Sequence, residues 1–277
     1  RGETIKIQGD DIVVSQAQEV LHEMMQTLSG KGDLTVRDVQ KLITLVKSDV
    51  NEKHDHSTTP DYVIYYGKKG AISAKTDGQN KYVEVVKNND VVFSIGPAGT
   101  GKTFLSVAFA VSALENHEVD RIILCRPAVE AGESLGFLPG DLKDKVDPYL
   151  APLYDSLHIL YAENQLVQLL ERKVIEVVPL AYMRGRTLDS AYMILDEAQN
   201  ASVLQMKMFL TRLGIGSRAI ITGDITQIDL KNRSDSGLLQ ASELLKNVPG
   251  IGIVKLDKKD VVRHPLVMEI IDAYDQN

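Results

Sequence analysis

A glycine-rich stretch at residues 96–103 constrains the fold of this 277-residue chain more than any other feature. It satisfies every fixed position of the phosphate-binding-loop (P-loop) pattern G-x-x-x-x-G-K-[ST]. Its residues are Gly96, Pro97, Ala98, Gly99, Thr100, Gly101, Lys102 and Thr103. Residues 91–95 before it are typical of a buried strand, and residues 104–111 after it are typical of an apolar helix. An ordinary glycine-rich turn is the alternative, but this context favours a strand–loop–helix unit of an α/β protein.

Each part of the P-loop pattern has a chemical reason. The glycines let backbone N–H groups turn inward around a phosphate, and the following helix adds the positive end of its dipole. The ammonium of Lys102 would reach the β- and γ-phosphates, and the hydroxyl of Thr103 would hold Mg²⁺. The stretch therefore predicts binding of ATP with Mg²⁺ by all eight loop residues.

Strand and helix patterns alternate from residue 89 to the end of the chain. Apolar strands are expected at residues 91–95, 121–126, 174–178, 192–195, 219–222 and 251–256. Helices are expected at residues 104–111, 142–161, 165–171, 203–213, 237–247 and 266–274. Short, all-apolar strands that alternate with helices predict a mainly parallel sheet covered by helices on both faces. Residues 62–66 and 71–72 flank a Gly-Lys-Lys-Gly stretch and predict a small hairpin.

Residues 1–60 are predicted to form a small, separate α+β domain with a linker, and residues 61–277 the large domain. A strand is expected at residues 5–7 and a helix at 12–28. A second helix begins after Thr35, its predicted N-cap, with Asp38 in the first turn. The polar stretch 48–61 is interpreted as a linker. It contains His54, Asp55 and His56, so a metal site is the alternative there.

Two further strand ends carry polar groups. Asp196 and Glu197 follow the apolar strand at 192–195. Asp196 is expected to hold Mg²⁺ beside Thr103, and Glu197 to polarise the water that attacks the γ-phosphate. Gln227 follows the strand at 219–222 and is expected to hydrogen-bond the γ-phosphate or that water. The alternatives are a helix cap for the two carboxylates and a simple strand-to-loop turn before Gln227.

Charge and cysteine content restrict the partners and the compartment. The net charge is −7, and both the first 60 residues and the remainder are net negative. Broad electrostatic adhesion to nucleic acid is therefore not expected, and RNA or DNA would have to use a local groove. The single cysteine, Cys125, cannot form an internal disulfide and indicates a reducing compartment, the cytoplasm. The longest apolar run, 104–114, is too short to span a membrane.

Residues 96–103, 196–199 and 223–227 together resemble the nucleotide motifs of superfamily 1 helicases. They are more similar still to those of the PhoH family of cytoplasmic ATPases. Longer blocks that resemble this family lie at residues 126–133, 136–141, 179–187 and 261–265. The resemblance spans about residues 61–277 and is only loose in residues 1–60.

This resemblance implies a RecA-like ATPase core, ATP with Mg²⁺, and a link to RNA metabolism. It also implies association with an endoribonuclease, a YbeY-type enzyme in some bacteria and a fused PIN domain in other members. Gln79 resembles the glutamine that reads adenine in superfamily 1, and Arg263 the arginine that contacts the γ-phosphate. A surface glutamine and a structural ion pair are the alternatives. Residues 1–60 resemble half of a KH-like unit, but they lack its Gly-x-x-Gly loop.

The chain departs from a helicase because a helicase carries two RecA-like domains with ATP between them. Only one P-loop is present here, so half of the usual site is absent. We therefore expect a homo-oligomer, a hexameric ring, with nucleotide at the subunit interfaces and an arginine donated in trans. The candidates for that arginine are Arg184, Arg186, Arg233 and Arg263.

Three functions fit these features. The first is a Mg²⁺-dependent ATPase coupled to RNA metabolism that unwinds or remodels RNA. The second is a nucleotide-gated adaptor that presents a nuclease without unwinding. The third is a P-loop kinase for a small molecule, which a water-activating Glu197 disfavours.

Overall fold

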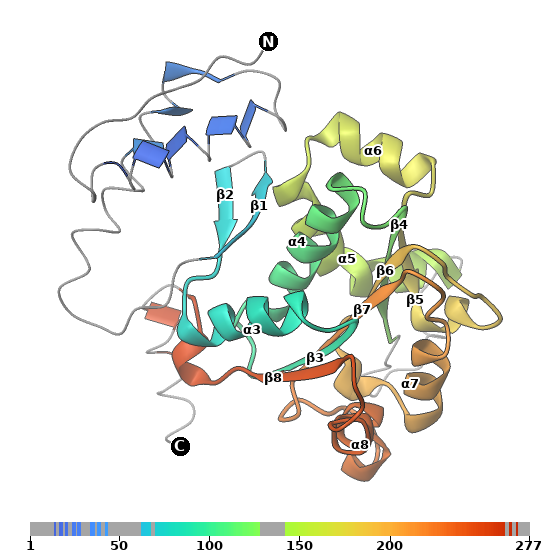
Figure 1. Cartoon of the computed structure of the whole chain (residues 1–277). Helices are drawn as coiled ribbons and strands as arrows, with labels where there is room; N and C mark the ends of the chain where they lie inside the picture. Colours follow the sequence, from blue (N-terminus) through green and yellow to red (C-terminus); the bar gives the residue numbers. More distant parts are fainter. Residues whose placement is uncertain are drawn as a thin grey trace. The chain divides into compact units, whose positions relative to one another are not determined.

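The computed structural model describes residues 62–67, 70–127 and 142–263, with scattered positions between 14 and 43 and between 266 and 270. The chain consists of two compact units, Arg1–Pro60 and Asp61–Asn277 (Figure 1). The predicted strand at 5–7, the linker at 48–61 and most of the helix at 266–274 lie outside the described residues. The same holds for the candidate metal ligands His54, Asp55 and His56.

The described positions of the first unit are mostly helical. Every described position between 14 and 28 is in a helix, as are those between 36 and 43. Thr35 precedes the second run: its Oγ1 accepts a hydrogen bond from Asp38 N at 3.3 Å, and Asp38 Oδ2 accepts one from Thr35 N at 3.1 Å. This reciprocal pairing caps the helix, as predicted for Thr35. The KH-like half stays a prediction.

Six strands of the described part of the second unit form one parallel sheet. Their order is β5 (Ile175–Pro179), β4 (Arg121–Arg126), β6 (Ala191–Leu195), β7 (Arg218–Gly223), β3 (Val91–Ile95) and β8 (Ile251–Lys255). Every neighbouring pair runs parallel, and β3 and β6 are buried at every residue. Burial on both faces explains their unbroken apolar runs. Strand β7 lies between the P-loop strand β3 and the acidic strand β6.

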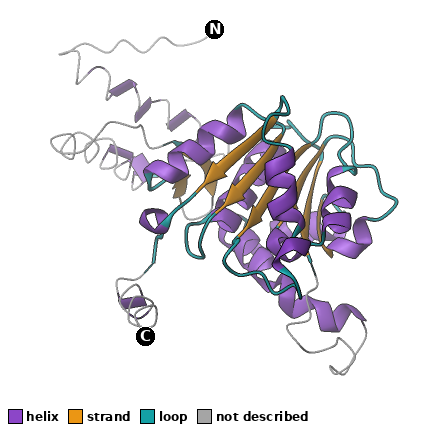
Figure 2. Ribbon diagram, turned by 90° about the horizontal axis from the view of Figure 1, so that it is seen from below, coloured by secondary structure: helices purple, strands orange, loops and turns teal. Residues whose placement is uncertain are grey.

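Helices cover both faces of this sheet (Figure 2). Alternate residues of each strand pack into two separate cores, so Val92 contacts one core and Phe93 the other. Four helices bury side chains in the first core: α3 (Asp77–Lys87), α4 (Lys102–Glu115), α5 (Leu142–Leu160) and α6 (Glu163–Glu171). Helices α7 (Val203–Leu210) and α8 (Gly237–Leu244) pack in the second core. The predicted α/β fold, a RecA-like core with a parallel sheet between helices, is confirmed.

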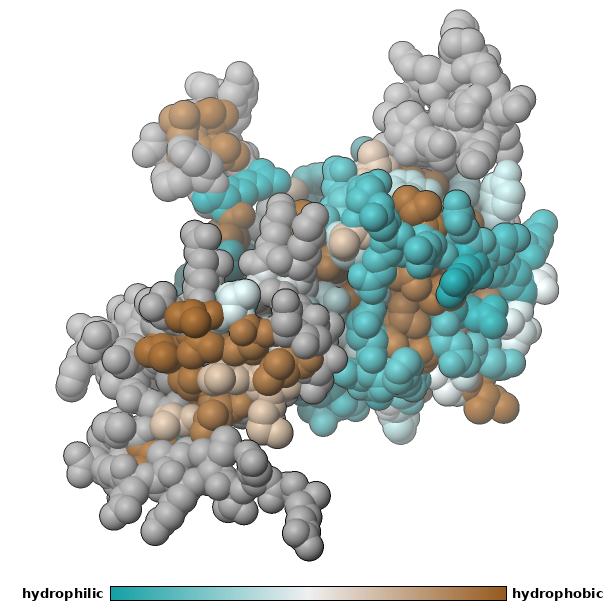
Figure 3. Space-filling model, turned by 90° about the horizontal axis from the view of Figure 1, so that it is seen from above, coloured by the Kyte–Doolittle hydropathy of each residue, from teal (hydrophilic) through white to brown (hydrophobic). Residues whose placement is uncertain are grey.

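Short elements complete the unit. Strands β1 (Val63–Gly67) and β2 (Gly70–Ser73) form the predicted antiparallel hairpin, and Tyr65 and Ile72 pack against the first core. In the described residues, four short 3₁₀ helices lie in the connections: η2 (Leu180–Met183), η3 (Ala198–Asn200), η4 (Arg233–Asp235) and η5 (Lys258–Asp260). On the face shown in Figure 3, apolar residues gather in groups, one of them bordered on both sides by hydrophilic residues. Among the described residues, no helix combines the length and apolarity that crossing a membrane requires.

Helix α3 (Asp77–Lys87) was not predicted from the sequence. Thr76 caps it, since Thr76 Oγ1 accepts a hydrogen bond from Gln79 N at 3.2 Å. Asp260 then accepts hydrogen bonds from Thr76 Oγ1 at 2.6 Å and Gly78 N at 3.0 Å. Few apolar side chains hold the helix to the core, among them Tyr82, whose ring meets Phe109 edge-on at 5.2 Å. The apolar side chains of α3 are confined to residues 82–86, a stretch too short for helical periodicity to predict the helix.

Helix ends also differ from the predictions. Helix α7 ends at Leu210, before the predicted residue 213, because Leu213 forms a bridge with Leu188 and Gly214 N donates to Leu188 O at 2.8 Å. Helix α8 ends at Leu244 and not at residue 247. Helix α4 is longer than predicted and begins at Lys102. None of these differences moves a strand end, so the candidate site keeps its predicted place at the carboxyl edge of the sheet.

Candidate nucleotide site

The P-loop connects β3 to α4 and depends on its glycines. Gly99 and Gly101 have φ values of 85° and 81°, a left-handed conformation that other residues rarely adopt. Gly96 lies against strand β8, where an added Cβ would come within 2.6 Å of Leu256 O. The loop thus wraps closely around the N-terminus of α4, where backbone N–H groups and the helix dipole favour an anion.

Outside partners hold the backbone of this loop. Val262 N donates to Gly99 O at 3.0 Å, and Gln79 Nε2 donates to Thr100 O at 3.1 Å. Gly96 N donates to Gly223 O at 3.1 Å. The carbonyl and the N–H of one peptide point in opposite directions. Carbonyls that are bonded outward therefore leave the following N–H groups facing the inside of the loop.

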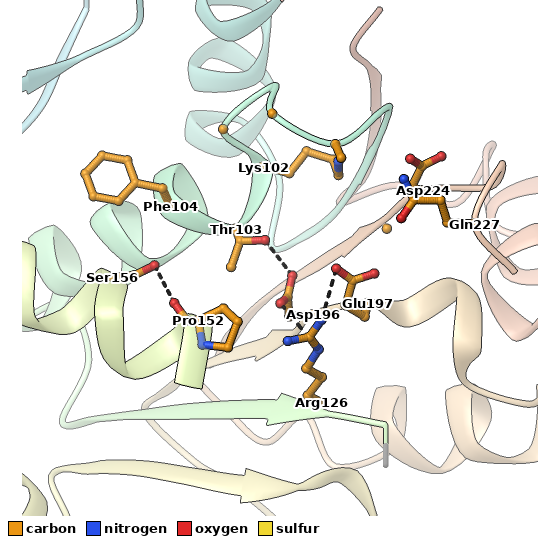
Figure 4. Close-up of a pocket in the computed structure, with 14 residues that line it drawn as sticks. Lys102, Thr103, Phe104, Arg126, Pro152, Ser156, Asp196, Glu197, Asp224 and Gln227 are labelled. Atoms are coloured by element: carbon orange, nitrogen blue, oxygen red, sulfur yellow. Dashed lines mark hydrogen bonds and ion pairs between the residues drawn. The ribbon is translucent and has the colours of Figure 1, made fainter. Parts of the chain in front are cut away.

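Lys102 is the buried cation of the site. Only 9% of it is exposed, and its Nζ donates to Pro97 O at 2.8 Å. Burial lowers the pKa of Lys102 from its ordinary value, while the negative charges of Asp224, Glu197 and Asp196 act in the opposite direction. The three carboxylates therefore help to keep a positive charge beside the loop (Figure 4).

Asp196 joins three elements at the end of β6. Its Oδ1 accepts hydrogen bonds from Thr103 Oγ1 at 2.7 Å and from Thr222 Oγ1 at 2.6 Å. Asp196 is 3% exposed, so its geometry is fixed by these partners. The structure thus brings together Thr103 and Asp196, the two residues that the sequence predicts to hold Mg²⁺.

Glu197 follows Asp196 in a strained backbone conformation. Its φ of 51° is left-handed, which costs a residue with a side chain about 1–2 kcal/mol. Arg126 Nη2 lies 3.2 Å from Glu197 Oε1, and Gln199 Nε2 donates to Glu197 Oε2. Such strain is typical of functional positions, and here it turns the carboxylate toward Arg126 and the pocket (Figure 4).

The loop after β7 adds a third carboxylate. Asp224 is 4% exposed, and its Oδ1 accepts hydrogen bonds from Thr226 N at 2.9 Å and Thr226 Oγ1 at 2.6 Å. In the described part of the chain, Asp224 Oδ2 is buried and has no hydrogen-bond partner. Gln227 is exposed at the rim, where its backbone N donates to Asp224 O at 3.0 Å. This loop therefore presents acceptors to the P-loop from the neighbouring strand.

These groups line one pocket of about 300 Å³. Its lining includes Ala98, Gly99, Gly101, Lys102, Thr103, Arg126, Asp196, Glu197, Asp224 and Gln227. That volume is at the lower end of the range for small-molecule sites. Most of the predicted site residues are thus brought together at one edge of the sheet.

Five predicted residues are not in the lining of the pocket: Gly96, Pro97 and Thr100 of the loop, and Gln79 and Arg263 beside it. Gln79 is 3% exposed, and its amide is engaged within the chain: Nε2 bonds Thr100 O, and Oε1 accepts from Lys75 N at 2.7 Å. Arg263 is exposed and lies so close to the P-loop that a Cβ on Gly99 would clash with its Nε. Its positive charge also lowers the pKa of Lys102, although burial is the larger cause.

The donor set fits Mg²⁺ with a triphosphate. Among the described residues there is no group of three or more His, Cys, Asp or Glu that would cage a metal ion alone. Mg²⁺ usually binds through one or two carboxylates together with phosphate oxygens and water. Asp196 supplies one carboxylate and Thr103 one hydroxyl oxygen, and the glycines leave room for phosphate at the loop.

Comparisons with known proteins agree with this site. A family model described as "PhoH-like protein" matches residues 71–275. A PhoH-like protein of Bacillus subtilis (strain 168) is 54% identical over 276 residues, which cover 100% of this chain and 86% of the relative. One of Mycobacterium tuberculosis (strain ATCC 25618 / H37Rv) is 48% identical over 274 residues, which cover 99% of this chain and 77% of the relative. The chain belongs to the PhoH-like protein family.

This membership confirms the resemblance inferred from the sequence and makes the chain a P-loop NTPase that binds nucleotide. Among solved structures, the UvsW helicase from bacteriophage T4 aligns at 11% identity with a TM-score of 0.41, covering 86% of this chain and 78% of that one. A TM-score this low supports no statement about function.

Sequence reasoning missed three residues of this PhoH-like site. Arg126 appears only within a family block, without a role, and Gln199 only as the last residue of its motif. Asp224 lies within the motif at 223–227 but was not predicted as a site residue. The available signal was position, since each follows or ends an apolar strand at the same sheet edge. What was lacking is the strand order, which makes β4 the neighbour of β6.

Proposed function

We propose that this chain hydrolyses ATP in the presence of Mg²⁺, with Glu197 as the general base. One observation supports this most: Thr103 Oγ1 lies 2.7 Å from Asp196 Oδ1, and Glu197 lines the same pocket as Lys102. The P-loop amides and Lys102 would bind the phosphates. Thr103 and Asp196 would hold Mg²⁺, which neutralises the charge that develops on the phosphate oxygens when it is bound.

The remaining steps depend on this chain's own side chains. Glu197 takes a proton from the attacking water while the water oxygen bonds to the γ-phosphorus. The bond from that phosphorus to the bridging oxygen breaks, and ADP leaves with the electron pair. Gln227 in the lining of the pocket and Arg263 beside Gly99 are suited to contact the γ-phosphate.

A phosphate-release assay with Lys102→Ala tests the hydrolysis. The wild-type chain is expected to release free phosphate and ADP, and Lys102→Ala to fall to background because no cation then reaches the β- and γ-phosphates. Lys81→Ala, at an exposed position of α3, is the control and should match the wild type. Equal release by Lys102→Ala would contradict the proposal. A phosphorylated small molecule in place of free phosphate would favour a kinase.

We further propose that hydrolysis is coupled to RNA metabolism, in company with a YbeY-type endoribonuclease. The family resemblance supports this. The buried single cysteine, Cys125, supports a reducing compartment, the cytoplasm. Phosphate release is to be measured with and without single-stranded RNA, and unwinding with a labelled duplex. If RNA affects neither and the nuclease binds only with ATP, the chain is a nucleotide-gated adaptor.

A hexameric ring is proposed because a single core leaves the nucleotide open on one side. Of the candidate trans arginines, Arg184 and Arg233 are exposed, while Arg186 forms an ion pair with Glu176 at 2.7 Å. Arg263 lies against the P-loop of its own chain. An arginine supplied in trans accelerates such chemistry by about 10³–10⁵. Sedimentation with ATP tests the ring, and a fully active monomer would contradict it.

A further inference from the structure

Arg126 is a charged residue of the pocket to which the proposed reaction assigns no role. It is the last residue of β4, whose neighbour β6 carries the two carboxylates. The parallel register pairs Cys125 with Leu195, and Asp196 N donates to Cys125 O at 2.8 Å. One residue further along each strand, Arg126 therefore faces the carboxylate pair at the sheet edge (Figure 4).

The guanidinium of Arg126 has three polar partners. Nη2 lies 3.2 Å from Glu197 Oε1, and Nε lies 4.0 Å from Asp196 Oδ2. Nη1 donates to Tyr149 O of helix α5 at 2.8 Å. These contacts use three directions of a rigid planar fork, which a lysine ammonium could not reproduce. The hydrogen bond to the backbone of α5 anchors the guanidinium beside the carboxylates.

Glu197 depends on such an anchor. Its carboxylate follows that of Asp196 directly, and like charges at this distance repel each other. Arg126 spans both carboxylates and reduces that repulsion. On the other side, Gln199 Nε2 bonds Glu197 Oε2, while Gln199 Oε1 accepts from Asp224 N at 3.0 Å. Glu197 Oε1 thus has an ion-pair partner and Oε2 a hydrogen-bond donor, and the carboxylate keeps further lone pairs for water.

The contacts also indicate what Arg126 does not do. In the described part of the chain, its three partners belong to the carboxylate pair and to α5, and none belongs to the P-loop. The side chains of Arg126 and Glu197 are 20% and 34% exposed, so the pair is more confined than a surface salt bridge.

We propose that Arg126 is a positioning residue, which holds the Glu197 carboxylate in the orientation that accepts the proton from water. This inference rests on the proposed ATP hydrolysis and adds to that site the residue that orients its general base, Glu197. A base displaced by about 1 Å loses about a hundredfold in rate. Because Arg126 acts through Glu197 and does not contact the loop, its loss should lower turnover and leave nucleotide affinity unchanged.

The test measures phosphate release and the affinity for a non-hydrolysable ATP analogue on the same preparations. Arg126→Ala is expected to lower turnover between about tenfold and about a hundredfold, with analogue affinity within about twofold of wild type. In the Glu197→Gln background, Arg126→Ala is expected to cause no further loss, since the residue that it positions is gone. Arg121→Ala, at the exposed start of the same strand, is the matched control and should match the wild type.

The outcomes separate the two proposals. If wild type releases no more phosphate than Lys102→Ala, the proposed hydrolysis is wrong, and the role inferred for Arg126 is wrong as well. If wild type is active, the inference alone fails when Arg126→Ala turns over normally or faster. It also fails when analogue affinity drops as much as turnover, or when the double variant loses the same factor again. Should Arg126→Ala not fold, Arg126→Gln, which keeps an N–H donor for Tyr149 O, replaces it.

Discussion

The two sides of the pocket are held in different ways. On the P-loop side, backbone groups make the contacts: Gly99 O and Thr100 O accept from Val262 N and Gln79 Nε2. On the carboxylate side, side chains hold side chains, with Thr103 and Thr222 on Asp196, and Arg126 and Gln199 on Glu197. One side is held mainly through its backbone, and the other through contacts between side chains.

This difference assigns different work to the two sides. Backbone N–H groups bind phosphate in the substrate and the product alike, so the P-loop side should govern affinity. Charged side chains that meet the reacting water act mainly in the transition state, so the carboxylate side should govern turnover. Substitutions on each side test whether affinity depends on the P-loop side and turnover on the carboxylate side.

After Lys102→Ala, the largest expected effect is on the carboxylate side. Glu197→Gln removes the general base but keeps the shape, so turnover is expected to fall about 10²–10⁴-fold while ATP affinity stays near that of wild type. Rapid-quench hydrolysis and analogue titration measure the two quantities. Glu171→Gln, at an exposed position at the end of α6, serves as the control. Normal turnover in Glu197→Gln would remove this residue from its role.

A smaller effect is expected at Gly99 on the P-loop side. Its φ of 85° costs an alanine about 1–2 kcal/mol, and the new methyl group would displace Arg263. Gly99→Ala is therefore expected to lower ATP affinity about tenfold, as measured by calorimetry. Gly250→Ala is the control. Gly250 has a similar φ of 82° but lies directly before β8, so this substitution should lower only the thermal unfolding temperature. An unchanged affinity in Gly99→Ala would contradict the expectation that the P-loop side governs affinity.

The Gln79→Ala substitution tests whether this side-chain amide stabilises the P-loop or recognises the adenine base. Since its Nε2 is bonded to Thr100 O, we expect a several-fold loss of affinity that is equal for ATP and GTP. Competition titrations of both nucleotides measure the ratio. A selective loss of ATP binding would instead support the adenine-reading role that the sequence resemblance implies.

The smallest expected effect on the reaction is at Arg186. Its guanidinium forms two hydrogen bonds with Glu176, at 2.7 and 3.2 Å, outside the lining of the pocket. Arg186→Ala should lower the free energy of unfolding by about 1–2 kcal/mol and leave turnover unchanged. Denaturant unfolding and phosphate release are the measurements. A collapse of turnover in an intact oligomer would identify Arg186 as the arginine donated in trans.

Contiguous features were predictable from the sequence. The P-loop was recognised because its eight residues, the strand before it and the helix after it are neighbours in the chain. The apolar runs predicted the six strands of the sheet to within one residue at most ends, because strands buried on both faces need unbroken apolar sequence. Helix α3 was missed because its apolar residues span only positions 82–86, too short a stretch to show helical periodicity.

By itself, the sequence determined that a triphosphate loop follows a buried strand and that two carboxylates end another, since both depend on short-range backbone geometry and side-chain chemistry. Only the tertiary structure decided which groups meet. The strand order makes Arg126 the neighbour of Glu197, and the connection after β8 returns Val262 to Gly99. Strand order depends on how whole faces of the sheet bury apolar area, which is a property of the complete chain and not of any one segment.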